Sequence, residues 1–147
     1  FFFFFFLPIL QGKKQKQREV VYTEFHKIFA GIEYPMRGAQ DEQYGYIVNF
    51  WSDGKHEIRG DAMSGRTFKA MNKAAESNKE IADRVDLYKY RVPEELYDFK
   101  NDPDGLVNLI NDPFFKAEKE RLKTLLFREM RRSKDPLKSE FEKRFMQ

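Results

Sequence analysis

The segment from Pro93 to Pro113 constrains the fold of this chain more than any other. An edge-type strand is predicted at residues 95–99, followed by an acidic turn at residues 101–105 and by a Leu-rich stretch that ends at Asp112. Pro93 pushes the residue before it toward extended geometry, so a helix cannot continue into this strand. Asp is a good helix N-cap, and Pro fits the first helical position. The order therefore predicts a strand, a tight turn and the start of a helix.

Three further strands are predicted in the first half of the chain. Residues 19–26 are β-branched and aromatic, with apolar side chains on both faces, which favours a central strand. Residues 34–39 form a second candidate, and residues 43–51 a third in which large apolar side chains alternate with other residues. The short link at residues 40–42 predicts that the second and third strands pair antiparallel.

Helices are expected on both sides of the fourth strand. Ser64 is a candidate N-cap for a first helix, and the i, i+4, i+7 spacing of Ile81, Val85 and Tyr88 predicts a second. The final helix follows Asp112 and carries one apolar stripe, made of Phe115, Leu122, Leu125, Leu126 and Met130.

The predicted fold class is α+β. We expect a four-stranded antiparallel sheet packed against a long C-terminal helix, with a helical insertion between strands 3 and 4. Residues 1–18 are interpreted as a severed strand or linker with a basic loop, and residues 19–132 as the α+β subdomain. Residues 133–147 lose the apolar pattern and are predicted to form an exposed, charged tail.

Composition limits the classes of function. The 147 residues carry 27 Lys and Arg against 24 Asp and Glu, mixed along the chain, which predicts a solvated surface and no nucleic-acid partner. No membrane partner is expected either, because the ten-residue apolar opening, with its six Phe, is too short to cross a bilayer and lacks signal-peptide features. The absence of cysteine excludes a disulfide, a thiol nucleophile and a Cys-based metal site.

Few residues suggest chemistry by themselves. Glu24 and His26 are two residues apart on a predicted strand, so both point to one face, as an anion contact or as an ordinary surface pair. The basic cluster of residues 13–18 could touch a sulfated glycan or be a solvated loop. The acidic turn around Asp102 fails the calcium-loop register and is interpreted as a turn or cap. No nucleophile–base motif or phosphate loop is present.

Five stretches, in order, resemble the C-terminal subdomain of the sulfatase family. The run ELYDFKNDPDGLVNLINDP, from Glu95 to Pro113, is similar to its ELYDL-x-x-DP-x-E-x-x-NL-x-x-DP segment. Residues 7–12 and 18–26 resemble the LP-L-L-x-G run and the strand after it, while residues 34–37 and 64–68 are most like heparan N-sulfatases (N-sulfoglucosamine sulfohydrolases, sulfamidases). Many sulfatases carry basic residues where this chain has Gln40, Gln43 and Gly45, so any sugar contact made by those groups is missing.

The resemblance implies a parent enzyme that hydrolyses sulfate esters or sulfamates on glycosaminoglycan-type sugars. The Cys/Ser-x-Pro/Ala-x-Arg signature of the formylglycine nucleophile is not in this chain. Calcium and formylglycine are therefore expected in an N-terminal catalytic domain, with no cofactor and no metal ligand in this chain. We expect the chain to be inert alone and to shape the rim of the substrate pocket.

The same resemblance supplies candidate site residues and partners. Substrate-binding candidates are His26, Glu24 and Arg37, and Arg37 could instead form a structural ion pair. The expected partners are the N-terminal catalytic domain and a sulfated glycan, in a periplasmic, extracellular or lysosomal location. The alternative function is a non-catalytic glycan-binding or interaction module.

Overall fold

The structure, a computed structural model, describes residues 10–13, 19–28 and 31–146. Most of the predicted N-terminal linker and basic loop, residues 1–18, lies outside the described residues. The prediction that the basic cluster contacts a glycan therefore stays a prediction.

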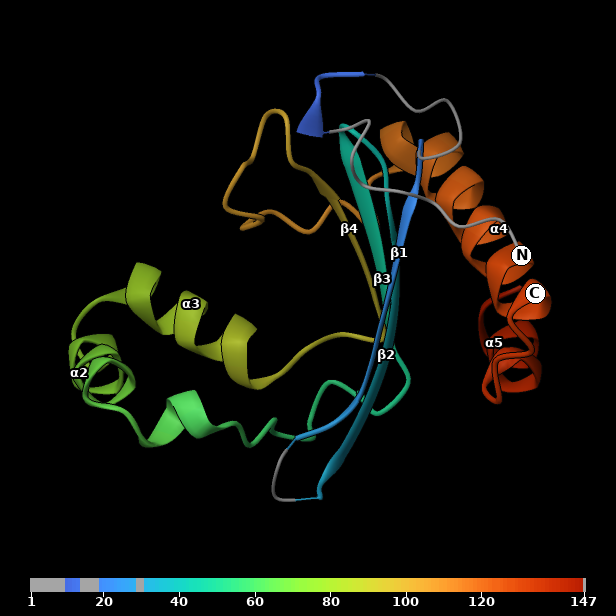
Figure 1. The fold of residues 1–147 in the computed structure, drawn as a ribbon. Coiled ribbons are helices and arrows are strands. Elements are labelled where there is room, and N and C mark those ends of the chain that lie inside the picture. Colours follow the sequence, from blue (N-terminus) through green and yellow to red (C-terminus); the bar gives the residue numbers. More distant parts are fainter. Residues whose placement is uncertain (1–9, 14–18, 29–30, 147) are drawn as a thin grey trace.

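Four antiparallel strands form one sheet, as predicted (Figure 1). They are β1 (Val21–Lys27), β2 (Glu33–Gln40), β3 (Tyr44–Asn49) and β4 (Glu94–Asp98), and their order in the sheet follows their order in the chain. The hairpin register sets Tyr46 of β3 opposite Ala39 of β2 and Leu96 of β4. Since alternate residues share a face, this register gathers apolar side chains on one side of the sheet.

Strand β1 lies at the edge of the sheet, which corrects the prediction of a central strand. It pairs only with β2 in the described part of the chain, and every one of its seven residues is exposed. Its apolar side chains on two faces suggested burial, yet Val21 is 58 % exposed. The residues of a segment indicate that it suits a strand, but its place at the edge or the centre depends on which other strands pair with it.

The insertion between β3 and β4 is helical, as predicted. It holds a 3-10 turn, η1 (Asp61–Ser64), and two helices, α2 (Arg66–Ala75) and α3 (Lys79–Lys89). Ser64 is not the N-cap of α2, because it ends η1 and Gly65 occupies the cap position. Asn78 caps α3 by accepting a hydrogen bond of 3.2 Å from the amide of Ile81. Figure 1 shows α2 and α3 on the opposite side of the sheet from the C-terminal helices.

The core lies between the sheet and the long helix α4 (Lys116–Arg132). Asp112 caps the preceding turn, η2 (Pro113–Phe115), with its Oδ1 2.9 Å from the amide of Phe114, so the predicted start is confirmed. The apolar stripe is confirmed at its centre, while Phe115 and Leu125 are only half-buried. The buried cluster comprises Ala39, Tyr46, Val48, Phe50, Leu96, Leu122, Leu126, Met130, Phe141 and Phe145.

The exposed tail predicted from Ser133 onward is wrong. Residues 138–145 form a further helix, α5 (Lys138–Phe145), which lies beside α4 (Figure 1). Phe141 is fully buried and stacks on Phe127 with ring centroids 5.7 Å apart. Phe145 packs edge-on against Phe50 at 5.8 Å. Phe141 and Phe145 are four positions apart and so share one face of this charged helix, which they pack into the core.

Candidate functional site

The three predicted site residues meet on one face of β1 and β2. Glu24 and Arg37 are direct partners in the antiparallel register. The Glu24 Oε2 atom lies 3.8 Å from His26 Nε2 and 4.0 Å from Arg37 Nε. The sequence spacing placed Glu24 and His26 together, and the strand register adds Arg37.

Arg37 is buried and its guanidinium group is fully engaged. Its Nε lies 2.5 Å from Asp135 Oδ2, and its Nη2 lies 3.2 Å from Asp135 Oδ1. The Nη1 atom donates to the carbonyl of Met36 at 2.8 Å and more weakly to that of Phe25 at 3.3 Å. Only 3 % of the side chain is exposed. The geometry favours the structural ion pair, and substrate binding by Arg37 stays a prediction.

Asp135 is the member of this cluster that the sequence did not reveal. It is buried between α4 and α5 and also accepts a hydrogen bond of 2.8 Å from the amide of Leu137. Burial by itself would raise the pKa of the Asp135 carboxyl. The hydrogen bonds from Arg37 and Leu137, with the charges of Arg37 and His26, outweigh burial and lower that pKa below its usual value. Asp135 is therefore a carboxylate near neutral pH.

Glu24 and His26 form the accessible part of the cluster. Their side chains are 67 % and 54 % exposed. Solvent screens such a pair, so their contact contributes little to stability. A carboxylate and an imidazole held side by side on an open strand edge can accept or donate hydrogen bonds to a ligand.

The acidic motif after β4 builds the backbone of a turn. Asp98 Oδ1 accepts from the amides of Lys100 at 3.2 Å and Asn101 at 3.3 Å. Asp102 Oδ2 accepts from the amides of Leu106 at 2.7 Å and Val107 at 2.8 Å. The prediction that Asp102 is a turn or cap residue is confirmed. The carboxylates of Asp98 and Asp102 accept hydrogen bonds from backbone amides, so both residues stabilise the turn.

Asn108 protects the outer edge of β4. Its Oδ1 accepts from the amide of Leu96 at 3.0 Å and from that of Ile110 at 3.1 Å. The carbonyl of Leu96 in turn accepts from the amide of Leu109 at 2.8 Å. The edge strand thus has its central backbone groups satisfied by the loop that follows it, which manages the exposure of unpaired strand groups.

A buried polar network lies on the sheet face opposite the core. Glu95 is 1 % exposed and accepts hydrogen bonds from Asn49 Nδ2 at 2.7 Å and from the Tyr97 hydroxyl at 2.8 Å. Its Oε2 also lies 3.1 Å from Arg91 Nη1. Burial, and then the charge and hydrogen bond of Glu95, raise the pKa of the Tyr97 hydroxyl. The network fixes Arg91 between α3 and β4, beside the helical insertion.

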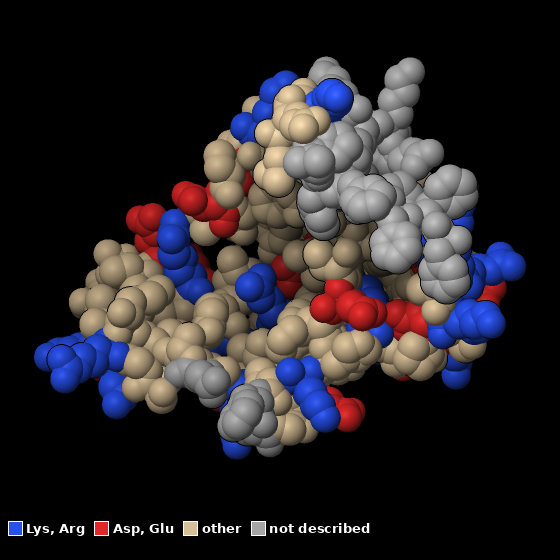
Figure 2. All heavy atoms as spheres, viewed as in Figure 1, with Lys and Arg blue, Asp and Glu red and all other residues tan. Residues whose placement is uncertain are grey.

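The described residues offer no cluster for a metal ion. No group of three His, Cys, Asp or Glu side chains within residues 10–13, 19–28 and 31–146 has the proximity that a metal site needs. Among the helices of that part of the chain, none is long and apolar enough to span a membrane. Figure 2 shows acidic and basic side chains interspersed on the face that it presents.

One curated relative matches this chain across most of its length. It is an ulvan-active sulfatase from Formosa agariphila, 32 % identical over 134 residues, which are 90 % of this chain and 25 % of the relative. This chain therefore spans about a quarter of the relative. No protein-family model matches the chain.

Solved structures share the fold. A 2-O GAG sulfatase aligns with 90 % of this chain and 20 % of its own, at a TM-score of 0.55 and 24 % identity. A protein solved with its substrate, D-glucosamine-2-N,6-O-disulfate, aligns with 89 % of this chain and 20 % of its own, at a TM-score of 0.53 and 16 % identity. This chain is thus similar in sequence to part of one sulfatase and shares the fold of part of the solved proteins.

Proposed function

We propose that this chain forms the C-terminal subdomain of a sulfatase that removes sulfate groups from a sulfated polysaccharide. The observation that carries the proposal is the match over 90 % of the chain to an ulvan-active sulfatase. The agreement in fold supports it independently of sequence identity. In this proposal an N-terminal catalytic domain supplies formylglycine and calcium, and this chain shapes the rim of the substrate pocket.

The substrate class is a sulfated sugar polymer. The names of the relatives point to ulvan, to a 2-O-sulfated glycosaminoglycan and to a disulfated glucosamine. These substrates share a sulfate group on a sugar ring and differ in the sugar. A heparan N-sulfatase, which would cleave a sulfamate, acts on one substrate of this class. It is the more specific function that the sequence motifs suggest.

The uncovered side of β1 is the proposed contact with the catalytic domain. Phe25 is 39 % exposed and Val21 is 58 % exposed, and alternate positions place both on the face away from α4. Ile32 in the following turn is also 39 % exposed. An apolar strand edge of this kind is normally covered by another polypeptide segment. Glu24 and His26, on the other face, are the proposed rim residues.

Sulfate release by the natural protein that contains this chain tests the proposal. Ulvan, 2-O-sulfated heparin oligosaccharides and N-sulfated glucosamine are incubated with that protein and with the 147-residue chain, and free sulfate is measured by ion chromatography. We expect release by the natural protein and none by the chain alone. A natural protein with no upstream Cys/Ser-x-Pro/Ala-x-Arg sequence in its peptide map, and no release from any substrate, would contradict the proposal.

The rim role has its own readout in the same assay. Replacing His26 with Gln should raise KM more than it lowers kcat, because a rim residue contacts the sugar and not the reacting sulfur. Replacing His56, an exposed histidine in the loop after β3, with Gln is the matched control. Equal effects of the two substitutions on KM would contradict the proposal that His26 is a rim residue.

A further inference from the structure

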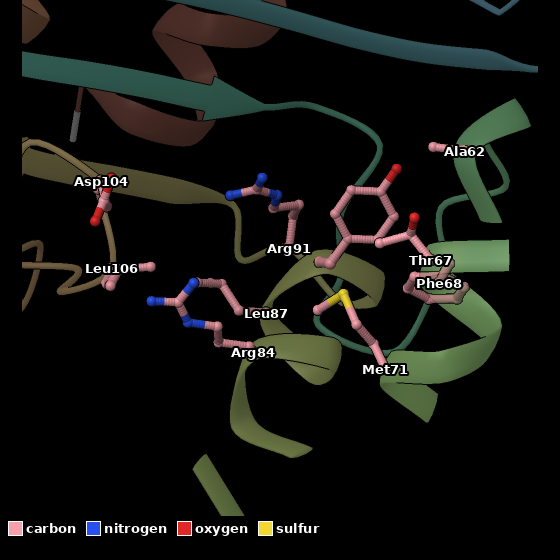
Figure 3. Close-up of a pocket in the computed structure, with 11 residues that line it drawn as sticks. Ala62, Thr67, Phe68, Met71, Arg84, Leu87, Arg91, Asp104 and Leu106 are labelled. Carbon is pink, nitrogen blue, oxygen red and sulfur yellow. The ribbon is translucent and has the colours of Figure 1, made fainter. Parts of the chain in front are cut away.

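A cavity of 360 Å³ lies between the helical insertion and the turn after β4 (Figure 3). Its apolar wall includes Phe68 and Met71 of α2 and Leu87 of α3. Arg84, Arg91 and Asp104 line it on the polar side. Figure 3 shows Arg84 and Arg91 on the side toward Asp104 and Leu106, with Phe68 and Met71 across from them.

The apolar wall carries two aromatic rings. Phe68 and Tyr88 contact each other with centroids 5.3 Å apart and planes tilted by 47°, and both line the cavity. The negative face of an aromatic ring attracts the weakly positive C–H groups of a neighbouring molecule. A sugar ring presents such C–H groups on one face and hydroxyl groups at its edge.

Arg91 is held in place before any ligand arrives. Its Nη1 pairs with Glu95 at 3.1 Å, and Glu95 is itself fixed by Asn49 and Tyr97. Because Glu95 is buried, the guanidinium group of Arg91 is positioned by the interior of the fold. A positioned donor loses little freedom when it binds a ligand.

Arg84 supplies a cation that the fold does not use. Its side chain is exposed, and its guanidinium group forms no ion pair or hydrogen bond within the described part of the chain. Two parallel N–H donors of a guanidinium group fit a carboxylate or a sulfate. Asp104, also exposed at the cavity, can accept hydrogen bonds from hydroxyl groups.

We propose that this cavity binds one anionic sugar unit, with its ring against Phe68 and Tyr88 and its charged group on Arg84. The volume is at the small end of ligand sites, which are about 300–1,000 Å³. The identity of the sugar as part of the substrate rests on the proposed function. The cavity anchors the polymer and takes no part in sulfate hydrolysis.

Methionine methyl NMR on the 147-residue chain locates the binding. The probes are a heparosan tetrasaccharide with carboxylates only, a κ-carrageenan tetrasaccharide with sulfates only, and neutral cellotetraose. We expect at least one anionic probe to shift the Met71 methyl signal, while the signal of Met130, a residue of α4 buried in the core, stays unchanged. The two anionic probes distinguish carboxylate from sulfate recognition. Equal affinity for cellotetraose, or no Met71 shift with any probe, overturns the proposal.

Two substitutions separate the cavity from general charge attraction. Arg84→Gln should weaken binding about tenfold, as expected for loss of a charge-assisted hydrogen bond. Arg66→Gln is the matched control, because Arg66 is exposed on α2 and does not line the cavity. Thr67→Trp should abolish binding by filling the cavity without changing charge. Equal weakening by Arg84→Gln and Arg66→Gln, or full binding by the Trp variant, contradicts the proposal.

The NMR test of the sugar site can succeed or fail independently of the sulfate-release assay. Sulfate release by the natural protein without a Met71 shift in the chain removes the sugar site and leaves the proposed function. A Met71 shift in the chain leaves the site, and it removes the proposed function when the natural protein has no upstream Cys/Ser-x-Pro/Ala-x-Arg sequence and releases no sulfate. Sugar binding by the isolated chain that is absent from the natural protein shows a polypeptide segment in the cavity, which also overturns the proposal.

Discussion

Arg37 and Asp135 form a buried, two-point ion pair between positions 98 residues apart in sequence. The Nε–Oδ2 and Nη2–Oδ1 distances are 2.5 and 3.2 Å. One partner lies in β2 and the other in the turn between α4 and α5. The pair therefore attaches the C-terminal helices to the sheet, beside the exposed Glu24 and His26.

Removing the charge of Asp135 should lower the free energy of unfolding substantially. Asp135→Asn leaves the buried guanidinium of Arg37 with only the exposed carboxylate of Glu24 nearby, and breaking a buried pair in this way costs about 3–5 kcal/mol in free energy of unfolding. Urea denaturation of the 147-residue chain measures it. Glu24→Gln, which changes an exposed carboxylate on the same cation, should cost less than about 1 kcal/mol. Equal small losses for both variants would mean that the pair does not hold the helices.

Stability should fall in acid through the same carboxylate. The folded pKa of Asp135 is lower than its unfolded value, about 3.9. The unfolded state therefore binds the proton first, so the contribution is present above about pH 4 and is lost as pH falls through the folded pKa. Asp41, whose pKa is also lowered, acts with the same sign. Urea denaturation between pH 6 and pH 3 should show a shallower dependence for Asp135→Asn, and an unchanged slope would contradict this assignment.

Helix α5 should contribute strongly to stability. Phe141→Ala empties a fully buried site between Phe50 and Phe127, and such a truncation costs about 3–5 kcal/mol. Glu142→Ala, one residue along on the exposed side, should change stability by about 0.5 kcal/mol or less. Thermal unfolding followed by circular dichroism compares the two. An equal Tm for both variants would restore the prediction of a loose tail.

The edge of β4 should open when Asn108 is replaced. Asn108→Ala removes the acceptor of the Leu96 amide, and leaving a buried donor unpaired costs about 1–3 kcal/mol. Hydrogen exchange at the Leu96 amide should accelerate, while the amide of Tyr46, in the middle of the sheet, changes less. Asn111→Ala, at a neighbouring exposed asparagine, is the control. Unchanged exchange at Leu96 would show that Leu109 alone protects the edge.

The sequence alone determined the elements whose signals are local. The alternation in residues 43–51 predicted β3, and the Asp112 and Pro113 pair predicted the start of the final helix, because alternation and capping depend on neighbours in the chain. The two-residue spacing of Glu24 and His26 likewise placed them on one face. The ordered motifs also resembled those of sulfatases, and a curated relative that is similar to 90 % of this chain is a sulfatase.

Tertiary structure decided everything that depends on distant partners. The edge position of β1 follows from its lack of a second neighbour in the described sheet, which its own apolar residues could not reveal. Arg37 acquired Asp135 only through packing, and Phe141 turned a charged segment into part of the core. The cavity around Arg84 likewise needs α2, α3 and the turn after β4 to come together. Burial and pairing are properties of the assembled fold, because each group's energy depends on what surrounds it there.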